Sequence, residues 1–298
     1  MTKGVNVKKI RKAVIPAAGF GTRFLPATKS MPKEMMPIID KPAIHYAVEE
    51  AVRAGAEEII FITGRGKRAL EDYFDHSYEL EDTLRKKGKD ELLRQVIEVS
   101  EMADIVYIRQ KEPLGLGHAV LRAKDLVGDE PFIVILPDVL MDDAGESTKE
   151  MVEICQKTGQ SVIGVKEIDW DKVSSYGIVA KDGEKDVFDI KGVVEKPKRE
   201  EAPSNLSIYG RYVLTPDIFE YLEKTVPGAG GEIQLTDALE AQIKDKGAKG
   251  MIYKGDYFDT GDKLGFLQAT VHMALKHEKL GGEFSKYLTE NFCGCKKD

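Results

Sequence analysis

Short apolar runs recur along the first half of the chain, and each is followed by a polar or glycine-containing segment. Four such runs occupy residues 12–17, 57–63, 104–110 and 130–138. Their length and their content of Ile, Val and Phe are typical of buried strands. Because the segments between them are long enough for crossover helices, the pattern predicts parallel strands joined by helices.

The segments between the runs support this interpretation. Residues 43–55 place their apolar side chains on one helical face and end in Gly55, where a C-cap is expected. Residues 67–102 and 118–127 also predict helices. The first half of the chain therefore alternates strand and helix.

The second half has a different pattern. Residues 177–183 and 186–197 alternate polar and apolar positions around a turn, which predicts a two-stranded antiparallel insertion rather than another crossover. The other elements predicted there are strands at residues 161–165 and 207–214, helices at 216–225 and 234–246, short strands within 249–262 and a helix at 263–278.

Together these elements predict an α/β fold, namely a doubly wound, mostly parallel, Rossmann-like sheet with a small antiparallel insertion and a C-terminal helical arm. We expect one α/β domain over residues 1–280, with a distinct subregion at about residues 170–260. Residues 281–298 are expected to form a C-terminal tail.

Composition and charge limit the classes of function. The net charge of −7 argues against general affinity for nucleic acid. No apolar run approaches the ~20 residues that cross a bilayer, and the first run, from Ala13, lacks the pattern of a secretion signal. Cys155, Cys293 and Cys295 form neither a disulfide framework nor a four-ligand zinc site. We therefore expect a cytoplasmic protein that binds neither membranes nor nucleic acid.

Positive charge gathers at one end of the chain. Residues 1–41 contain nine Lys or Arg and two Asp or Glu, so this segment could bind a small polyanion. Five of these cations precede or begin the first apolar run, and we expect them to be a solvated tail. They are Lys3, Lys8, Lys9, Arg11 and Lys12.

The loop after the first predicted strand, residues 17–26, lies where open α/β sheets bind ligands. A dinucleotide-binding fingerprint would need a third glycine where Phe24 stands, and no Gly-Lys-Ser/Thr of a Walker loop follows. Pro26 and Pro32 disfavour a long helix whose dipole could hold phosphate, so the countercharge is expected from side chains. Residues 17–33 contain three cations that can supply this countercharge: Arg23, Lys29 and Lys33.

Two polar residues end predicted strands, at the edge where α/β sheets build their sites. Asp138 follows the most apolar strand, and a carboxylate there could hold Mg²⁺, which takes one or two protein carboxylates with phosphate oxygens and water. Gln110 offers both a donor and an acceptor that could pair with a pyrimidine edge.

The segment AAGFGTRFLPATKSMPKEMMPIIDKPAIHY, from Ala17, resembles the signature segment of the sugar-1-phosphate nucleotidyltransferases. Its PKEM-P spelling is most similar to the bacterial members that use UTP and glucose 1-phosphate. The resemblance continues over nearly the whole chain, through QKEPLGLGHAV, LPDVL, YGIV, VVEKP, YGRYVL, GEIQLTDAL and DTGD. It implies a Mg²⁺-dependent transfer of a uridylyl group from UTP to glucose 1-phosphate, with the sugar bound near residues 170–260.

The resemblance also implies three catalytic residues. Arg23 and Lys33 would hold the triphosphate and the leaving pyrophosphate, and Lys196 would bind the phosphate of the sugar. The metal ligands would be Asp138 and Asp259. Asp262 is close enough in the sequence to leave the choice of second ligand open.

Substrate contacts are expected along the same motifs. Gln110 would read uracil, and Glu195 would accept hydrogen bonds from sugar hydroxyls. Because neighbours on a strand point to opposite faces, Glu195 and Lys196 can both serve only if the strand twists or ends there, as Pro197 allows. The expected substrate-binding residues are Ala17, Ala18, Gly19, Gly21, Glu34, Gln110, Gly115, Asp138, Gly177, Glu195, Lys196 and Val213.

Three alternatives stay open. The enzyme could prefer thymidine triphosphate or another hexose 1-phosphate, since a methyl group is worth only ~1–3 kcal/mol in a pocket. It could be a glycosyltransferase that consumes a nucleotide sugar, although the cationic loop speaks against this. It could be a non-catalytic regulatory relative, which should have lost a cation or an aspartate. We also expect a homo-oligomer, either a dimer or a tetramer.

Overall fold

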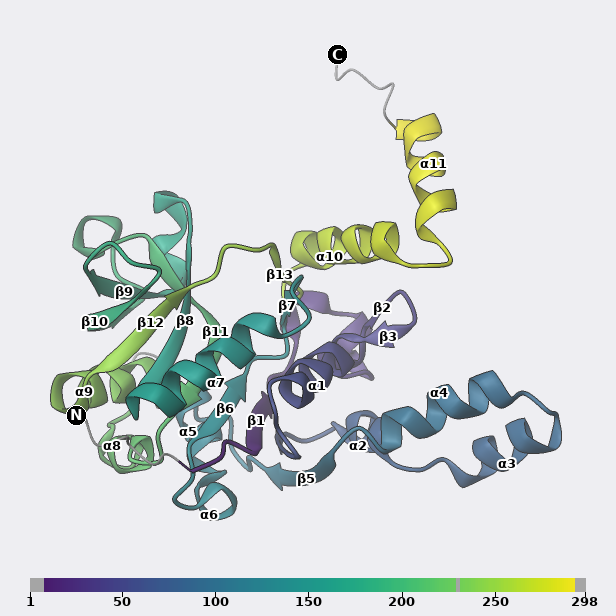
Figure 1. Cartoon of the computed structure of the whole chain (residues 1–298), viewed down its shortest axis with the longest axis horizontal. Coiled ribbons are helices and arrows are strands. Elements are labelled where there is room, and N and C mark those ends of the chain that lie inside the picture. The colour runs from purple at the N-terminus through teal and green to yellow at the C-terminus, as the bar shows by residue number, and fades with distance from the viewer. Residues whose placement is uncertain (1–7, 229–230, 293–298) are drawn as a thin grey trace.

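A computed structural model describes residues 8–228 and 231–292, and a nine-stranded sheet forms its centre (Figure 1). The strand order is β5-β4-β1-β6-β11-β8-β12-β10-β9. The bounds are β1 Lys12–Ala17, β4 Glu58–Thr63, β5 Asp104–Arg109, β6 Phe132–Ile135, β8 Ser161–Glu167, β9 Gly177–Asp182, β10 Val187–Glu195, β11 Leu206–Leu214 and β12 Ala248–Ile252. Two small sheets pair β2 Pro37–Ile38 with β3 Lys41–Pro42, and β7 Val139–Met141 with β13 Tyr257–Asp259.

Helices cover both faces of the central sheet. One layer contains α1 Ala43–Arg53, α2 Arg68–Phe74 and α7 Glu146–Thr158. The other contains α5 Leu116–Leu121, α6 Lys124–Val127, α8 Ile218–Lys224 and α9 Leu235–Lys246. The helices α3 Tyr78–Lys86 and α4 Asp90–Ser100 form a projecting hairpin, and α10 Lys263–Lys276 and α11 Gly281–Phe292 form the C-terminal arm (Figure 1).

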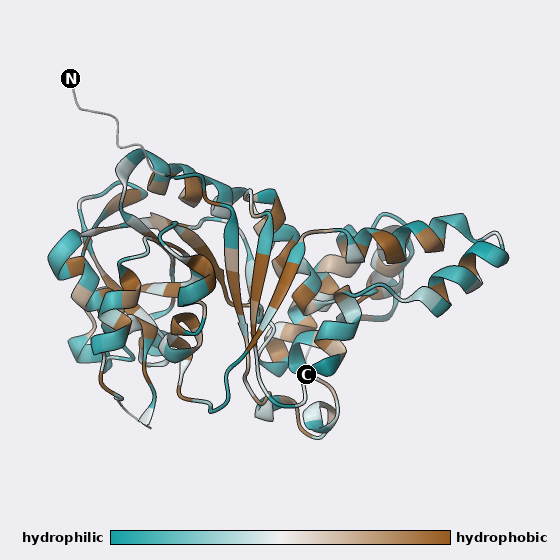
Figure 2. Ribbon diagram, turned by 90° about the horizontal axis from the view of Figure 1, so that it is seen from below, coloured by the Kyte–Doolittle hydropathy of each residue, from teal (hydrophilic) through white to brown (hydrophobic). Residues whose placement is uncertain are grey.

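Alternation along the central strands produces the two cores. In β1, Val14 packs into the core beneath α5, α8 and α9, whereas Ile15 packs into the core beneath α1 and α7. Ile60 and Phe61 of β4 repeat this arrangement. Because both faces are buried, these strands read as continuous apolar runs. Figure 2 shows the strands as largely hydrophobic and the helices as hydrophobic on one side only.

The expectation of an α/β fold is confirmed, but the sheet is mixed rather than mostly parallel. The neighbours β5, β4, β1 and β6 are parallel, as expected. The next strand, β11, lies antiparallel to both β6 and β8. The predicted hairpin of β9 and β10 is present, and it joins the main sheet through β12. All nine residues of β11 are buried. Burial on both faces is compatible with a parallel or an antiparallel neighbour, so the pattern could not predict the orientation of this strand.

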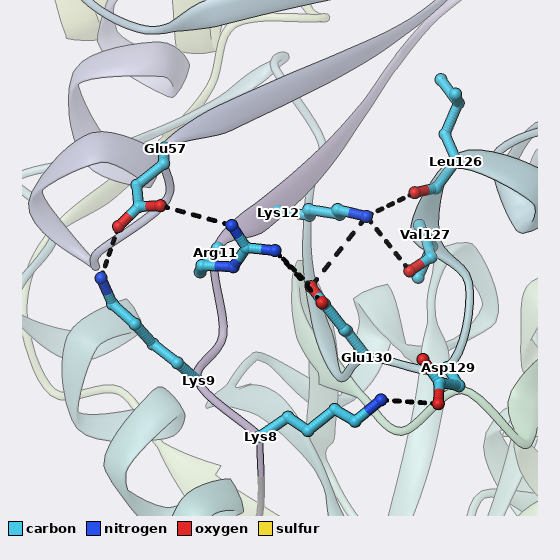
Figure 3. Close-up of polar contacts among 9 residues, drawn as sticks. All are labelled: Lys8, Lys9, Arg11, Lys12, Glu57, Leu126, Val127, Asp129 and Glu130. Carbon is cyan, nitrogen blue, oxygen red and sulfur yellow. Dashed lines mark hydrogen bonds and ion pairs between the residues drawn. The ribbon is translucent and has the colours of Figure 1, made fainter.

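The predicted solvated tail is only partly correct, because Lys8, Lys9 and Arg11 are exposed but paired with carboxylates, and Lys12 is half-buried. Figure 3 shows basic side chains paired with carboxylates at the amino-terminal edge of the sheet. The pairs are Lys8 with Asp129 at 2.6 Å, Lys9 with Glu57, Arg11 with Glu57 at 3.7 Å and Arg11 with Glu130 at 3.1 Å.

Lys12 also lies 4.0 Å from the Glu130 carboxylate, but its shorter contact is with backbone. Its Nζ lies 2.6 Å from the carbonyl oxygen of Leu126, at the end of α6 (Figure 3). The side-chain hydrogen bond from Lys9 also lowers the pKa of Glu57. These basic residues therefore fasten the start of β1 to its surroundings, whereas Lys3 lies outside the described residues.

Other expectations from composition can also be placed. Cys155 is buried in α7, where burial raises the pKa of its thiol to about 12, as expected of an inert core cysteine. Cys293 and Cys295 lie outside the described residues. None of the helices within the described ranges is both long and apolar enough to cross a membrane.

Candidate active site

The loop after β1 forms short 3-10 turns rather than a long helix, as its prolines predicted. These turns are η1 Thr22–Phe24, η2 Ala27–Lys29 and η3 Lys33–Met35. Gly21 has a φ of 65°, and a Cβ there would lie 3.0 Å from the Cβ of Lys33. Thr28 Oγ1 donates to the carbonyl of Gly21 at 2.7 Å. Glycine at this position therefore lets the stem of Lys33 pack against the loop.

Lys33 reaches from this loop to the turn between β6 and β7. Its Nζ lies 2.6 Å from Oδ2 of Asp138. The pairing of β7 with β13 brings Asp259 to the same place. A Cβ built on Gly261 would lie 3.0 Å from Asp259 Oδ1 and 3.1 Å from Asp138 Oδ2. The two carboxylates therefore flank the same small space.

Charge at this point is balanced among three buried or half-buried groups. Burial and the Asp138 carboxylate both raise the pKa of Asp259. Burial would also raise the pKa of Asp138, but the Lys33 ammonium keeps it below its usual range. Against the effect of burial, the carboxylates of Asp138 and Glu34 raise the pKa of Lys33. Two carboxylates that repel each other beside one cation are a donor set that a divalent cation would stabilise.

Arg23 lies on another side of this space. Its Nη1 is 3.5 Å from the carbonyl oxygen of Gly261. A cavity of about 160 Å³ is lined by Arg23, Asp138, Tyr176 and Asp259, together with apolar residues of β11. The sequence-predicted triphosphate cation and both predicted metal ligands thus share one cavity.

Asp262 serves a different purpose. Its carboxylate accepts hydrogen bonds from the amides of Leu264 at 3.4 Å and Gly265 at 2.9 Å, as the N-cap of α10. The Gly265 amide is the main cause of its lowered pKa. Asp259 is therefore the carboxylate that faces Asp138.

Gln110 lies directly after β5 and is buried. Its Nε2 is 3.1 Å from the carbonyl oxygen of Gly115 and 2.9 Å from Nδ1 of His118. Burial is the main cause of the lowered pKa of His118, so the imidazole is neutral and Nδ1 can accept. With both amide hydrogens engaged, Oε1 is the atom that can accept a hydrogen from a ligand.

Gly115 and Gly177 each allow a segment distant in the sequence to approach closely. Gly115 has a φ of 97°, and a Cβ there would lie 2.7 Å from the carbonyl oxygen of Ile233, just before α9. A Cβ on Gly177 would lie 3.3 Å from Oε2 of Glu195, which also accepts from Thr236 Oγ1 at 2.7 Å. The predicted base side and sugar side are therefore linked through the start of α9.

Lys196 follows the last residue of β10 and leaves the strand geometry. Its φ is 45°, in the left-handed region that non-glycine residues rarely occupy. Its amide donates to the carbonyl of Tyr176 at 3.0 Å, and its Nζ lies 3.3 Å from Glu195 Oε1. The strand therefore ends between these neighbours, which lets both side chains lie on the same side.

Glu34 is buried, and its Oε2 lies 2.7 Å from Nζ of the equally buried Lys67. Its Oε1 has no hydrogen-bond partner within the described residues. Ala18 is half-buried and Gly19 is exposed on the loop after β1. A Cβ on Gly64 would lie 2.8 Å from the carbonyl oxygen of Ala18, so the loops after β1 and β4 are in contact.

Two predicted residues do not offer side chains to the site. Val213 is fully buried in the core beneath α1 and α7, away from the cavity. Ala17 is buried in the same core, so only its backbone can contact a ligand. Conversely, sequence reasoning gave no role to Lys67, Tyr176 or Arg211. The motifs YGIV and YGRYVL contain Tyr176 and Arg211 and could have suggested them, whereas none of the motifs named above contains Lys67.

A cationic loop and paired carboxylates at the ends of the strands of an α/β sheet are typical of enzymes that act on nucleotide phosphates, the class that includes the nucleotidyltransferases. The chain belongs to the nucleotidyl transferase family, whose sequence profile matches residues 12–276. It is 52% identical over 285 residues to a UTP–glucose-1-phosphate uridylyltransferase of Staphylococcus saprophyticus, covering 95% of this chain and 98% of that protein.

Solved structures agree with this assignment. A UTP-bound UGPase from Acinetobacter baumannii superposes with a TM-score of 0.88 at 43% identity, covering 95% of this chain and 99% of that one. A UDP-glucose pyrophosphorylase complexed with UDP-glucose gives a TM-score of 0.82 at 46% identity, over 90% of this chain and 100% of that one.

Proposed function

We propose that the chain transfers the uridylyl group of UTP to glucose 1-phosphate, which forms UDP-glucose and releases pyrophosphate. One observation carries this proposal. Arg23, Lys33, Asp138 and Asp259 converge at one edge of the sheet, in a chain that matches a uridylyltransferase over 95% of its length.

The reaction is an in-line attack of a sugar-phosphate oxygen on the α-phosphorus, and both reactants are anions. Such transfers depend on positioning and charge neutralisation more than on covalent chemistry. In our proposal, Arg23 and Lys33 hold the triphosphate and then the leaving pyrophosphate. Lys33 uses one of its three hydrogens on Asp138 and has two left for phosphate oxygens.

Mg²⁺ is the cofactor we propose. Asp138 and Asp259 offer hard oxygen ligands around one small space, which fits an ion that takes one or two protein carboxylates. Asp262 is excluded from this role in our proposal because its oxygens cap α10. When bound, the ion neutralises phosphate charge and makes the α-phosphorus more electrophilic.

Gln110 is the proposed base reader. Its Oε1 can accept the N3–H of uracil, whereas neutral cytosine has no hydrogen there, so this contact favours UTP over CTP. Thymine presents the same edge with one more methyl group, which makes the thymidine nucleotide the nearest competitor.

The sugar side completes the proposed site. Glu195 would accept from sugar hydroxyls, and Lys196 would bind the phosphate that the sugar contributes. A non-catalytic relative should have lost at least one of the cations or aspartates of the site, and this chain has all of them. A glycosyltransferase would have no triphosphate tail for the Arg23 and Lys33 side chains to hold.

We also propose that the protein is a homo-oligomer. Apolar side chains on the arm are exposed, among them Leu264 and Leu267 of α10 and Tyr287 of α11. A cytoplasmic location stays a prediction from the sequence.

Pyrophosphate release tests the proposed function directly. Each of UTP, TTP, CTP and ATP is paired with glucose 1-phosphate and with its epimers, with Mg²⁺ or with excess chelator. We expect turnover to be fastest with UTP and glucose 1-phosphate and to stop without the divalent cation. Full activity in chelator, or an Asp138→Asn variant as fast as the parent, would refute the proposed site.

A further inference from the structure

Arg211 is a charged residue at the centre of the sheet. It lies on β11 and is 1% exposed, the largest of the fully buried side chains. Its Nε and Nη2 donate to the two carboxylate oxygens of Glu50 on α1, both at 2.7 Å. Thr148 Oγ1 of α7 donates to the same carboxylate at 2.5 Å. The charge is therefore fully paired, as burial requires.

Two of the three remaining N–H hydrogens of Arg211 are bonded to the turn that carries Asp138. Nη1 donates to the carbonyl oxygen of Leu136 at 2.9 Å, and Nη2 to that of Val139 at 2.6 Å. These two carbonyls bracket Asp138 in the sequence. One guanidinium thus spans the whole turn between β6 and β7.

The residue before Arg211 strengthens this contact. The carbonyl of Gly210 accepts from the amide of Leu136 at 2.9 Å. Gly210 has a φ of 89°, and a Cβ there would lie 2.9 Å from the side chain of Leu136. Glycine therefore allows β11 to approach the turn closely enough for Arg211 to reach both carbonyls.

The opposite side of the turn is held by the loop after β13. The carbonyl oxygen of Asp138 accepts from the amide of Thr260 at 2.7 Å and from its Oγ1 at 3.0 Å. Since Thr260 follows Asp259 in the sequence, these hydrogen bonds connect the two backbone segments that carry the carboxylates. With Thr260 on one side and Arg211 on the other, the backbone of Asp138 has little freedom to move.

We propose that Arg211 is a positioning residue, which fixes the turn at Leu136–Val139 and so aims the Asp138 carboxylate at the proposed metal site. This inference rests on the proposed function, because it assumes that Asp138 holds the cation. A buried ion pair is weak evidence for stability, since well-packed apolar side chains often replace one without loss. The hydrogen bonds from this guanidinium to the turn around Asp138 indicate that the pair fixes the position of that turn.

The test removes the whole pair at once, because Arg211 alone cannot be deleted without leaving the Glu50 carboxylate buried and unpaired. The double variant Glu50→Leu with Arg211→Met leaves the Thr148 hydroxyl and the carbonyls of the turn without these partners, so it should fold but melt below the parent temperature. We expect its dissociation constant for Mn²⁺, measured by electron paramagnetic resonance with UTP present, to rise roughly 10- to 100-fold, the usual cost of losing a residue that orients a metal ligand. The Mg²⁺ concentration that gives half-maximal turnover should rise in parallel.

Thr148→Val is the matched control, since it removes a hydrogen bond from the same buried cluster without touching the turn. It should change the melting temperature and leave Mn²⁺ binding unchanged. Arg211→Lys is the second variant, needed if the double variant does not fold. Its single ammonium cannot serve Glu50 and both carbonyls, so Mn²⁺ binding should weaken in the same direction.

The outcomes separate the two proposals. Parent-like Mn²⁺ binding in a folded double variant, or in Arg211→Lys, overturns the positioning role while leaving the proposed function intact. Parent-like Mn²⁺ binding and turnover in Asp138→Asn overturn the proposed metal site, and the positioning role falls with it. Weakened binding in the Arg211 variants and in Asp138→Asn, with an unchanged control, supports both.

Discussion

At the scale of single residues, Lys196 combines an unusual backbone with an expected catalytic role. Its φ of 45° places the side chain on the same side as Glu195 at the end of β10. Residues held in such conformations cluster at functional sites. We expect Lys196→Ala to lower kcat/KM for glucose 1-phosphate about a hundredfold, or ~3 kcal/mol of transition-state stabilisation, by analogy with oxyanion donors.

A glycine variant at position 196 separates the effect of losing the cation from the effect of the left-handed backbone. Lys196→Gly removes the cation but accepts the left-handed conformation, so its melting temperature should stay close to that of the parent. Lys196→Arg should rescue turnover poorly, because a planar fork cannot replace a compact ammonium. Normal kinetics in Lys196→Gly would mean that the lysine is a strand-end residue without a role in catalysis.

Gln110 should determine the choice of base. Gln110→Ala is expected to lower the ratio of the kcat/KM for UTP to the kcat/KM for CTP while leaving the fold intact. The side chain hydrogen-bonds to the Gly115 carbonyl and to His118 and is not part of the two main apolar cores, so little core packing is lost. Competition assays with the four triphosphates measure the ratio. Unchanged discrimination would remove Gln110 from base reading.

The pH dependence of this ratio gives an independent check. Protonated His118 cannot accept from Gln110, so discrimination should be lost only as pH falls through the folded pKa of the imidazole. Burial and the Arg122 guanidinium lower that pKa, while Glu112 opposes them, so the loss is displaced toward acid. The ratio should therefore be flat above the usual histidine range and should fall below it.

Much of this site could be predicted from the sequence, because its main side chains directly follow strands or belong to long motifs. What could not be predicted is the set of partners. Lys67 pairs with Glu34 from 33 residues away, and Arg211 pairs with Glu50 from 161 residues away. The core position of the Val213 side chain was also not predictable, because β11 is buried on both sides, and its contact with substrate stays a prediction.

At the scale of elements, apolar runs gave the strands and helical spacing gave the helices. The predicted runs at residues 12–17 and 57–63 became β1 and β4 almost without change. The direction of β11 could not be predicted, because it depends on the path of the chain and not on burial. The role of Asp262 as a cap was also hidden, since a cap and a metal ligand use the same residue type.

The two aspartates of this loop should respond differently to substitution. Asp262→Ala removes the N-cap of α10 and should cost about 1 kcal/mol of stability, with little change in the Mg²⁺ requirement. Asp259→Asn should raise the Mg²⁺ concentration for half-maximal turnover, because it removes a proposed ligand. Thermal melts and Mg²⁺ titrations of both variants test this. A larger metal effect for Asp262→Ala would exchange the two assignments.

At the scale of the whole molecule, the positive charges of the N-terminal segment form two groups, one paired with carboxylates and one at the proposed active site. The cations before β1 pair with carboxylates at the amino-terminal edge of the sheet, whereas Arg23 and Lys33 lie at the carboxyl-terminal edge. The uneven charge of residues 1–41 thus has two sources, the pairs at the amino-terminal edge and the cations of the proposed triphosphate site. The pairing of Lys8, Lys9 and Arg11 was not predicted, because their partners are distant in the sequence.

The C-terminal arm should be separable from catalysis. Every residue of the proposed site lies between Ala17 and Asp259, and α11 packs on α10 at the end of the arm (Figure 1). Removing residues 281–298 should therefore leave kcat/KM unchanged, which tests the predicted domain boundary. Tyr287 and Phe292 of α11 are more than half exposed, as expected if a second copy covers them. Light scattering should then show a smaller assembly for the shortened chain. Lost activity would place residues 281–298 within the catalytic domain, and an unchanged mass would place the contact between copies elsewhere.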